Sequence, residues 1–113
     1  MNFELSSSTQ KEIRSANHGA EKTGKIFVLE DEPDILRLIE HQLQLAGFET
    51  AGFTASMGML EQAHTEAAAL FLLDIMLPRE SGLEVCRRIR RNHRLGMTPV
   101  VFLTARAKRL IAS

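Results

Sequence analysis

The sequence predicts an α/β fold built on a parallel sheet, and two observations support this. Residues 26–29, 70–73 and 100–103 are short, continuously apolar runs, which are typical of strands buried on both faces. Segments with helical periodicity separate these runs along the chain. Strands that alternate with single helices form βαβ crossovers, and such crossovers produce a parallel sheet.

The first two strand–helix units are predicted as follows. Residues 26–29 form the first strand, and Pro33 then suits the first turn of a helix. Apolar side chains recur at helical spacing after it, and Gly47 ends this helix. Residues 48–53 are expected to form a short second strand, followed by a helix over residues 55–64.

The second half of the chain repeats this alternation. Residues 68–73 are predicted to form the third strand, followed by a loop over residues 75–82. A helix is expected over residues 83–93, with apolar side chains along one stripe. Residues 100–103 form the fourth strand, and residues 106–113 are expected to begin one more helix.

The N-terminal residues 1–24 are polar and rich in serine, so we expect a flexible tail. A short helix around residues 4–14 is only weakly indicated by the pattern. Residues 25–113 are then expected to form a single domain.

Composition excludes several classes of protein. The apolar and charged fractions, 44% and 25%, are those of an ordinary globular domain. The formal net charge is zero, so no overall field favours nucleic acid or a membrane. Cys86 is the single cysteine, which excludes an internal disulfide. The sequence has no membrane-span pattern and no apolar signal-peptide core, so we expect a cytoplasmic protein.

Carboxylates follow two of the predicted strands at the point where each strand ends. Glu30, Asp31 and Glu32 come directly after the first strand, and Asp74 follows the third. Ligands of open α/β sheets bind outside the carboxyl ends of the strands, so these acids are expected to share one crevice. Neighbouring anions repel, and a cation relieves that repulsion. The sequence therefore predicts a divalent metal site, and Mg²⁺ prefers such oxygen ligands.

The same strand ends suggest chemistry with phosphate. An aspartate carboxylate can act as a nucleophile and form an aspartyl-phosphate. Thr104 follows the fourth strand, and its hydroxyl can hydrogen-bond a phosphoryl oxygen. Phosphoryl transfer depends mainly on positioning and on charge neutralisation, so these few groups nearly suffice for it.

Three segments, taken in their order along the chain, carry a family resemblance: residues 26–33 (IFVLEDEP), residues 72–78 (LLDIMLP) with Ser81-Gly82 after them, and residues 101–105 (VFLTA). With these motifs the chain resembles a receiver domain of bacterial two-component response regulators. The residues of the first two motifs are most similar to those of the winged-helix transcription-factor branch. The resemblance implies a flavodoxin-like, doubly wound parallel sheet with strand order 2-1-3-4-5.

The resemblance also implies roles for individual residues. Asp74 would accept a phosphoryl group from a sensor histidine kinase, and Asp31 would bind Mg²⁺ directly. Glu30 would support the ion through water, and the backbone carbonyl of Met76 would complete the protein ligands. Thr104 would contact the phosphoryl group and shift when it arrives. The resemblance therefore implies a phosphoacceptor signalling module and no enzyme.

The sequence departs from the family pattern at its end. The family continues with a fourth helix, a fifth strand and a fifth helix, whereas this sequence stops at Ser113 after four of the five strand–helix units. A lysine follows the family's fifth strand, and Lys108 lies too close to Thr104 to correspond to it. The strand over residues 100–103 is then expected to be an exposed apolar edge without a covering helix on one flank. Marginal stability or self-association through this edge is predicted.

The sequence also allows three other functions to be weighed against this one. A phosphorylation-impaired receiver could act as a protein-interaction decoy or be an inactive remnant. An aspartate-nucleophile phosphatase is disfavoured, because that class has a second acid two residues after the nucleophile and Met76 occupies this position. The arginines of residues 87–94 lie around a helix without interleaved aromatic residues, so a solvated face is favoured over nucleic-acid binding.

Overall fold

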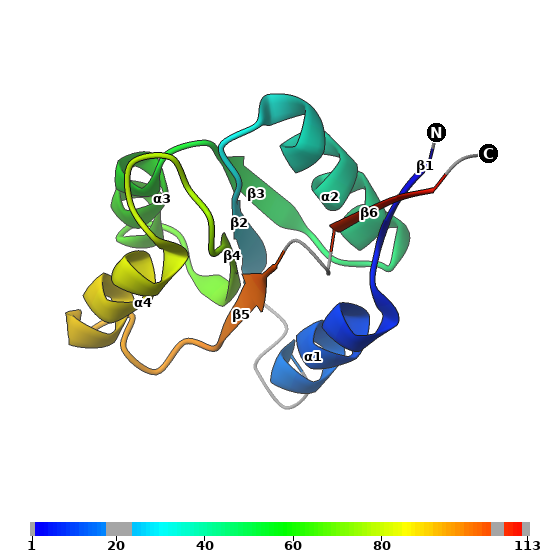
Figure 1. Ribbon diagram of the computed structural model, residues 1–113. Coiled ribbons are helices and arrows are strands. Elements are labelled where there is room, and N and C mark those ends of the chain that lie inside the picture. The colour runs from blue at the N-terminus through cyan, green and yellow to red at the C-terminus, as the bar shows by residue number, and fades with distance from the viewer. Residues whose placement is uncertain (1, 18–23, 105–107, 112–113) are drawn as a thin grey trace.

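The computed structural model describes residues 2–17, 24–104 and 108–111 (Figure 1). Its elements, in chain order, are β1 (Asn2–Leu5), α1 (Ser7–Asn17), β2 (Lys25–Leu29), α2 (Pro33–Leu45), β3 (Thr50–Phe53), α3 (Ser56–Ala63), β4 (Ala68–Asp74), α4 (Gly82–Arg91), β5 (Val100–Leu103) and β6 (Lys108–Ile111). In the described part of the chain, no helix has both the length and the apolar character needed to cross a membrane.

The main sheet has four parallel strands in the order β3-β2-β4-β5. This is the predicted order of the first four strands. Figure 1 shows α3 and α4 on one side of the sheet and α1 and α2 on the other. Each face of the sheet is therefore covered by two helices, as α/β architectures require.

The alternation of side chains along the strands divides the core into two layers. Ile26 and Val28 of β2 point to the side of α1 and α2, whereas Phe27 and Leu29 pack with α3 and α4. All four side chains are at most 1% exposed. Burial on both faces explains why the sequence shows a continuous apolar run here instead of an alternating one.

The loop after α2 adopts the conformation that its sequence predicts. Gly47 has a φ of +96°, which is in the left-handed region. A residue with a Cβ atom adopts this backbone conformation only at a cost, so glycine is favoured directly after the end of a helix. The chain then turns back and enters β3 at Thr50.

The N-terminal residues differ from the expected flexible tail. Residues 2–17 form β1 and α1, and residues 1 and 18–23 of the expected tail lie outside the described residues. α1 is largely polar, but Leu5, Thr9 and Ile13 are at most 4% exposed. Leu5 and Ile13 join the same core layer as Val101 and Leu103 of β5. The segment therefore covers the flank of the sheet that was expected to lack a helix.

The end of the chain also differs from expectation. Residues 106–113 were expected to begin a helix, but Lys108–Ile111 form β6, which pairs antiparallel with β1. The register joins Asn2 to Ile111 and Leu5 to Lys108. Figure 1 shows this two-stranded ribbon beside α2, apart from the main sheet. β5 is an edge strand of the main sheet, and self-association through it stays a prediction.

An ion pair lies at the amino-terminal end of the sheet. Lys25 Nζ lies 2.6 Å from Glu66 Oε1. This hydrogen bond raises the pKa of Lys25 and lowers the pKa of Glu66. The pair lies at the end of β2 opposite to the carboxylates that follow the strand.

Candidate metal centre

Three carboxylates meet where β2 and β4 end. Glu30 and Asp31 directly follow β2, and Asp74 is the last residue of the neighbouring strand β4. One carboxylate oxygen from each of the three residues lies within 4.8 Å of the other two. Glu30 and Asp74 are 1% and 3% exposed, and Asp31 is partly exposed. The structure thus brings together the acids that the sequence predicted would share a crevice.

Backbone amides orient two of these carboxylates. The amide of Glu32 donates to Glu30 Oε2 at 3.2 Å, and the amide of Met76 donates to Asp74 Oδ1 at 3.0 Å. A carboxylate that accepts a backbone hydrogen bond is fixed in one rotamer and stays available to a cation through its other lone pairs. Both acids are therefore preorganised by the first turn of chain after their strands.

The spacing of the carboxylates suits a small divalent ion. With Mg–O bonds of about 2.1 Å, two oxygens of one octahedral ion lie roughly 3 Å apart when adjacent and roughly 4.2 Å apart when opposite. The 4.8 Å limit of this cluster is only slightly wider. Mg²⁺ keeps several waters when protein-bound, so a carboxylate held through water fits the wider spacing. The donor set consists of hard oxygens, which Mg²⁺ and Ca²⁺ prefer.

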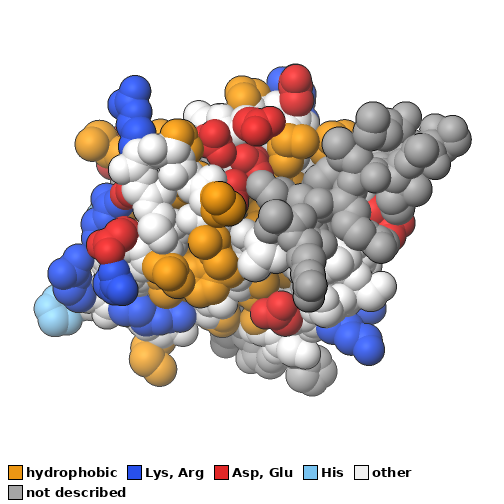
Figure 2. Space-filling view, viewed as in Figure 1, with side chains coloured by type: hydrophobic (Ala, Val, Ile, Leu, Met, Phe, Trp, Pro, Cys, Tyr) orange, Lys and Arg blue, Asp and Glu red, His pale blue; other side chains and the backbone are white. Residues whose placement is uncertain are grey.

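The carboxylates line an open cleft that also includes the loop after β4. Besides the acids, its described lining consists of Ile75, Met76, Leu77, Pro78 and Ser81. We call residues 75–81 the cleft loop. Its two ends are held together, because the Gly82 amide donates to the Ile75 carbonyl at 2.9 Å. Figure 2 shows acidic side chains gathered at the upper edge of the molecule, at the end of the sheet where the cleft lies.

Thr104 lies at the end of the neighbouring strand. Asp74 is in register with Leu103 of β5, and Thr104 follows it with an exposed side chain. Thr104 is not one of the residues that line the cleft. The fold therefore puts Thr104 at the same edge of the sheet as the acids, and its predicted contact with a phosphoryl group stays a prediction.

Sequence reasoning missed two structural features of the cleft loop. Glu80 connects the loop to Ser56 of α3 and to Arg88 of α4. Gly82, at the end of the loop, lies so close to Asp74 that an added Cβ would be 2.3 Å from the Asp74 carbonyl oxygen. A Gly after a loop is a signal for close backbone approach, whereas the Ser56–Glu80 contact joins residues too far apart in sequence for any local pattern.

Gly82→Ala is expected to damage both stability and the site. The new Cβ forces the backbone of Asp74 to move, and overpacking of this kind costs about 1–3 kcal/mol. Gly58→Ala in α3 is the matched control, since its Cβ would meet only the ring of Phe53 at 3.9 Å. That control should gain about 0.5–1 kcal/mol, because alanine favours helix over glycine. Urea unfolding of both variants measures the difference, and equal effects would contradict the close approach.

The comparisons with known proteins agree with this geometry. Residues 26–112 match the family model described as the response regulator receiver domain. The chain is 39% identical over 84 residues to the alkaline phosphatase synthesis transcriptional regulatory protein PhoP of Bacillus subtilis. It is 37% identical over 83 residues to the response regulator ArlR of Staphylococcus saprophyticus. These matches cover 73% and 74% of this chain but only 33% and 36% of those proteins.

Solved structures give the same assignment. The N-terminal domain of a response regulator receiver protein from Methanoculleus marisnigri superposes with a TM-score of 0.68 at 30% identity, covering 72% of this chain and 66% of that one. The response regulator TrrA of Thermotoga maritima, solved in complex with Mg²⁺-BeF, gives a TM-score of 0.64 at 32% identity, covering 73% and 70%. The predicted flavodoxin-like fold is confirmed, and the chain belongs to the response regulator receiver domain family.

Proposed function

We propose that this chain is a phosphoacceptor module of a two-component phosphorelay, with Asp74 as the residue that is phosphorylated. The proposal depends mainly on one observation. The Asp74 carboxylate is buried at a strand end, one of its oxygens is held by the Met76 amide, and two further acids lie within 4.8 Å. Receiver domains of this family are phosphorylated by sensor histidine kinases, and a kinase of this class is the proposed partner.

Mg²⁺ is the proposed cofactor. Asp31 and Asp74 would bind it directly, Glu30 would support it through water, and the backbone carbonyl of Met76 would be the third direct protein ligand. When bound, the ion supplies positive charge that neutralises the carboxylates and the incoming phosphoryl oxygens. The Mg²⁺-BeF complex of the similar protein TrrA supports this assignment by analogy.

The transfer itself requires little from the protein. One carboxylate oxygen of Asp74 bonds to phosphorus, while the bond from phosphorus to the histidine nitrogen breaks and that nitrogen keeps the electron pair. The chain contributes a nucleophile held at a fixed angle, and Thr104 would donate its hydroxyl to a phosphoryl oxygen. No turnover of a substrate is part of this proposal, so the chain acts as a signalling module.

The biological setting is also proposed by analogy. The chain spans about a third of the length of the curated relatives, several of which are named as transcriptional regulators. This favours the winged-helix transcription-factor branch for the receiver. The proposal also includes a cytoplasmic location and a receiver that does not itself contact nucleic acid.

Asp74→Asn is expected to abolish phosphorylation. With Mg²⁺ and a small acyl phosphate as donor, the wild-type chain should gain one phosphoryl group by intact mass, and the variant should gain none. The amide of asparagine replaces the carboxylate that is the proposed nucleophile, and an amide does not form an acyl phosphate, so no partial activity is expected. Asp34→Asn, an exposed acid at the start of α2, is the control and should be phosphorylated normally.

Two results would contradict the proposal. One is the absence of an adduct on the wild-type chain at saturating Mg²⁺, and the other is an adduct that persists in Asp74→Asn. If a sensor kinase still bound the unphosphorylated chain and also bound Asp74→Ala, the chain would instead be a decoy that interacts without accepting phosphate.

A further inference from the structure

Glu80 is the side chain of the cleft loop that reaches both neighbouring helices. Its Oε2 accepts a hydrogen bond of 2.5 Å from Ser56 Oγ, at the first residue of α3. Its carboxylate also forms an ion pair with the guanidinium of Arg88 in α4. Ser56 is 7% exposed, so this connection is partly shielded from water. We call the three residues Ser56, Glu80 and Arg88 the Glu80 tether.

Other contacts hold the two ends of the cleft loop, which is neither helix nor strand. At its start, the Ile75 amide donates to the Leu103 carbonyl at 3.1 Å, and at its end the Ser81 side chain caps α4. Leu77 packs against the core layer of α3 and α4. Glu80 lies between Leu77 and Ser81, and the Glu80 tether adds a polar link from this part of the loop to both helices.

A second hollow shows where this link matters. It is lined in part by Ser56, Glu80 and Arg88, and it shares Asp31, Leu77 and Pro78 with the acidic cleft. Residues of the cleft loop therefore line both hollows. A shift of the loop would move the Met76 backbone, which lines the acidic cleft and donates its amide to Asp74 Oδ1.

We propose that Glu80 is a positioning residue for the acidic cleft. Through Ser56 and Arg88 it holds the cleft loop at the distance from α3 and α4 at which Asp74 and the Met76 backbone can bind a divalent cation together. The proposal rests on the metal site proposed above. Residues that orient ligands without touching the metal typically change metal affinity by 10–100-fold when removed.

Electrostatics alone makes a different prediction, which separates the two explanations. Removing the negative charge of Glu80 would weaken cation binding through the field, but removing the positive charge of Arg88 would strengthen it. A tether predicts that Glu80→Ala and Arg88→Ala both weaken binding. Ser56→Ala changes no charge, so the field predicts no effect and the tether predicts a loss.

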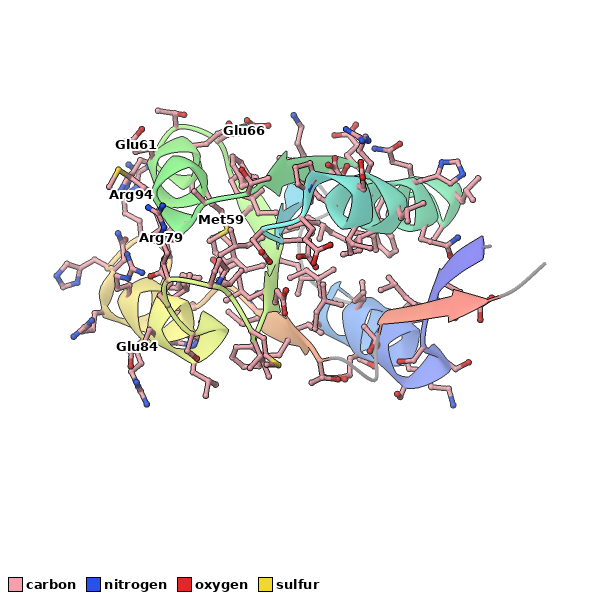
Figure 3. The ribbon with its side chains drawn as sticks, turned by 45° about the horizontal axis from the view of Figure 1, so that its top comes forward. Met59, Glu61, Glu66, Arg79, Glu84 and Arg94 are labelled. Carbon is pink, nitrogen blue, oxygen red and sulfur yellow. The ribbon has the colours of Figure 1, made fainter. Side chains whose placement is uncertain are left out.

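Glu84 supplies the matched control. It forms an ion pair with Arg87 on α4, with side chains 56% and 65% exposed. Figure 3 shows Glu84 on the side of α4 that faces away from α3. Glu84→Ala therefore removes the same charge and the same type of ion pair with an α4 arginine, but at a residue of α4 and not of the cleft loop.

The experiment measures Mg²⁺ affinity by isothermal titration calorimetry at fixed ionic strength. We expect Glu80→Ala and Arg88→Ala each to raise the Kd on the order of tenfold, with a smaller rise for Ser56→Ala. Glu84→Ala should stay within about twofold of wild type, as expected for an exposed charge in screening salt. The Glu80→Ala/Arg88→Ala double variant should be no weaker than the worse single variant, since both remove one contact. Thermal melts without Mg²⁺ check that each variant folds.

Three results would overturn the inference. Tighter binding by Arg88→Ala would assign the effect to the field. Wild-type affinity in Ser56→Ala together with equal affinities for Glu80→Ala and Glu84→Ala would show that the loop needs no tether. Wild-type protein that binds no Mg²⁺ would remove the proposed metal site and this inference with it, whereas the first two results leave the metal site intact.

Discussion

Ile13→Ala is expected to destabilise the protein by about 2–4 kcal/mol, the usual range for removing a buried isoleucine side chain to Cβ. Ile13 is 2% exposed and belongs to the core layer that also contains Val101 and Leu103. For a domain of this size such a loss corresponds to a decrease in Tm of roughly 10 °C or more. Circular dichroism melts of wild type and variant provide the measurement.

Glu12→Ala is the control for this prediction. Glu12 neighbours Ile13 on α1 but is exposed, and changes at such positions usually stay within about 0.5 kcal/mol. If the N-terminal residues formed the flexible tail that the sequence suggested, both variants would melt like wild type. A large difference between them therefore tests directly whether α1 packs on the sheet in solution.

Loss of the α1 packing is expected to affect the candidate site through β5. α1 packs against the strand whose last residues precede Thr104, and the amide of Ile75 donates a hydrogen bond to the Leu103 carbonyl at 3.1 Å. Loss of the α1 contact is thus expected to loosen the strand end that flanks Asp74. This links an N-terminal helix, which carries none of the proposed ligands, to the edge of the sheet that carries all of them.

The parts of the fold that sequence predicts are those with a strong local signal. The β2 and β4 runs are buried on both faces, so nearly every side chain in them is apolar and the pattern is unambiguous. Pro33 acts through its fixed φ and Gly47 through its access to positive φ, and α2 begins at Pro33 and ends two residues before Gly47. The meeting of Glu30, Asp31 and Asp74 follows from strand polarity alone once the sheet is parallel.

The parts that sequence could not predict depend on contacts distant along the chain. Among the side chains of α1 that the structure describes, Ile13 is the one large buried residue, which is too weak a signal to distinguish a packed helix from a polar tail. β6 exists as a strand because it pairs with β1 at the other end of the chain. The Ser56–Glu80 bond is equally non-local, and each residue alone resembles an ordinary polar surface position. Tertiary context decides in all three cases.

Asp31→Asn is expected to change stability in opposite directions with and without Mg²⁺. Without the ion, one of three neighbouring negative charges disappears, and the relieved repulsion should raise stability by about 1 kcal/mol for charges near 4.8 Å apart. With the ion, a direct ligand is missing, so the stabilisation by Mg²⁺ should largely vanish. For wild type at tenfold excess over Kd, mass action predicts a gain of about 1.4 kcal/mol.

The sign reversal makes this variant more informative than a simple loss. An acid that merely caps a strand end would give a small effect of one sign in both conditions. Asp34→Asn is the matched control, because the same chemical change is made in the first turn of α2, outside the cleft. That control should lose about 0.3–1 kcal/mol in both conditions, since an acid there favours the helix dipole, and should keep the full response to Mg²⁺.

Salt dependence separates charge repulsion from packing as the cause of the stability gain in Asp31→Asn. The gain of Asp31→Asn without Mg²⁺ arises from repulsion between charges, so 1 M NaCl, with a Debye length of about 3 Å, should shrink it. A gain that survives high salt would point to packing and not to charge as its cause. If melts in EDTA and in Mg²⁺ instead moved together, the three acids would not share one cation, and Asp74 would have to accept phosphate without the ion that neutralises its neighbours.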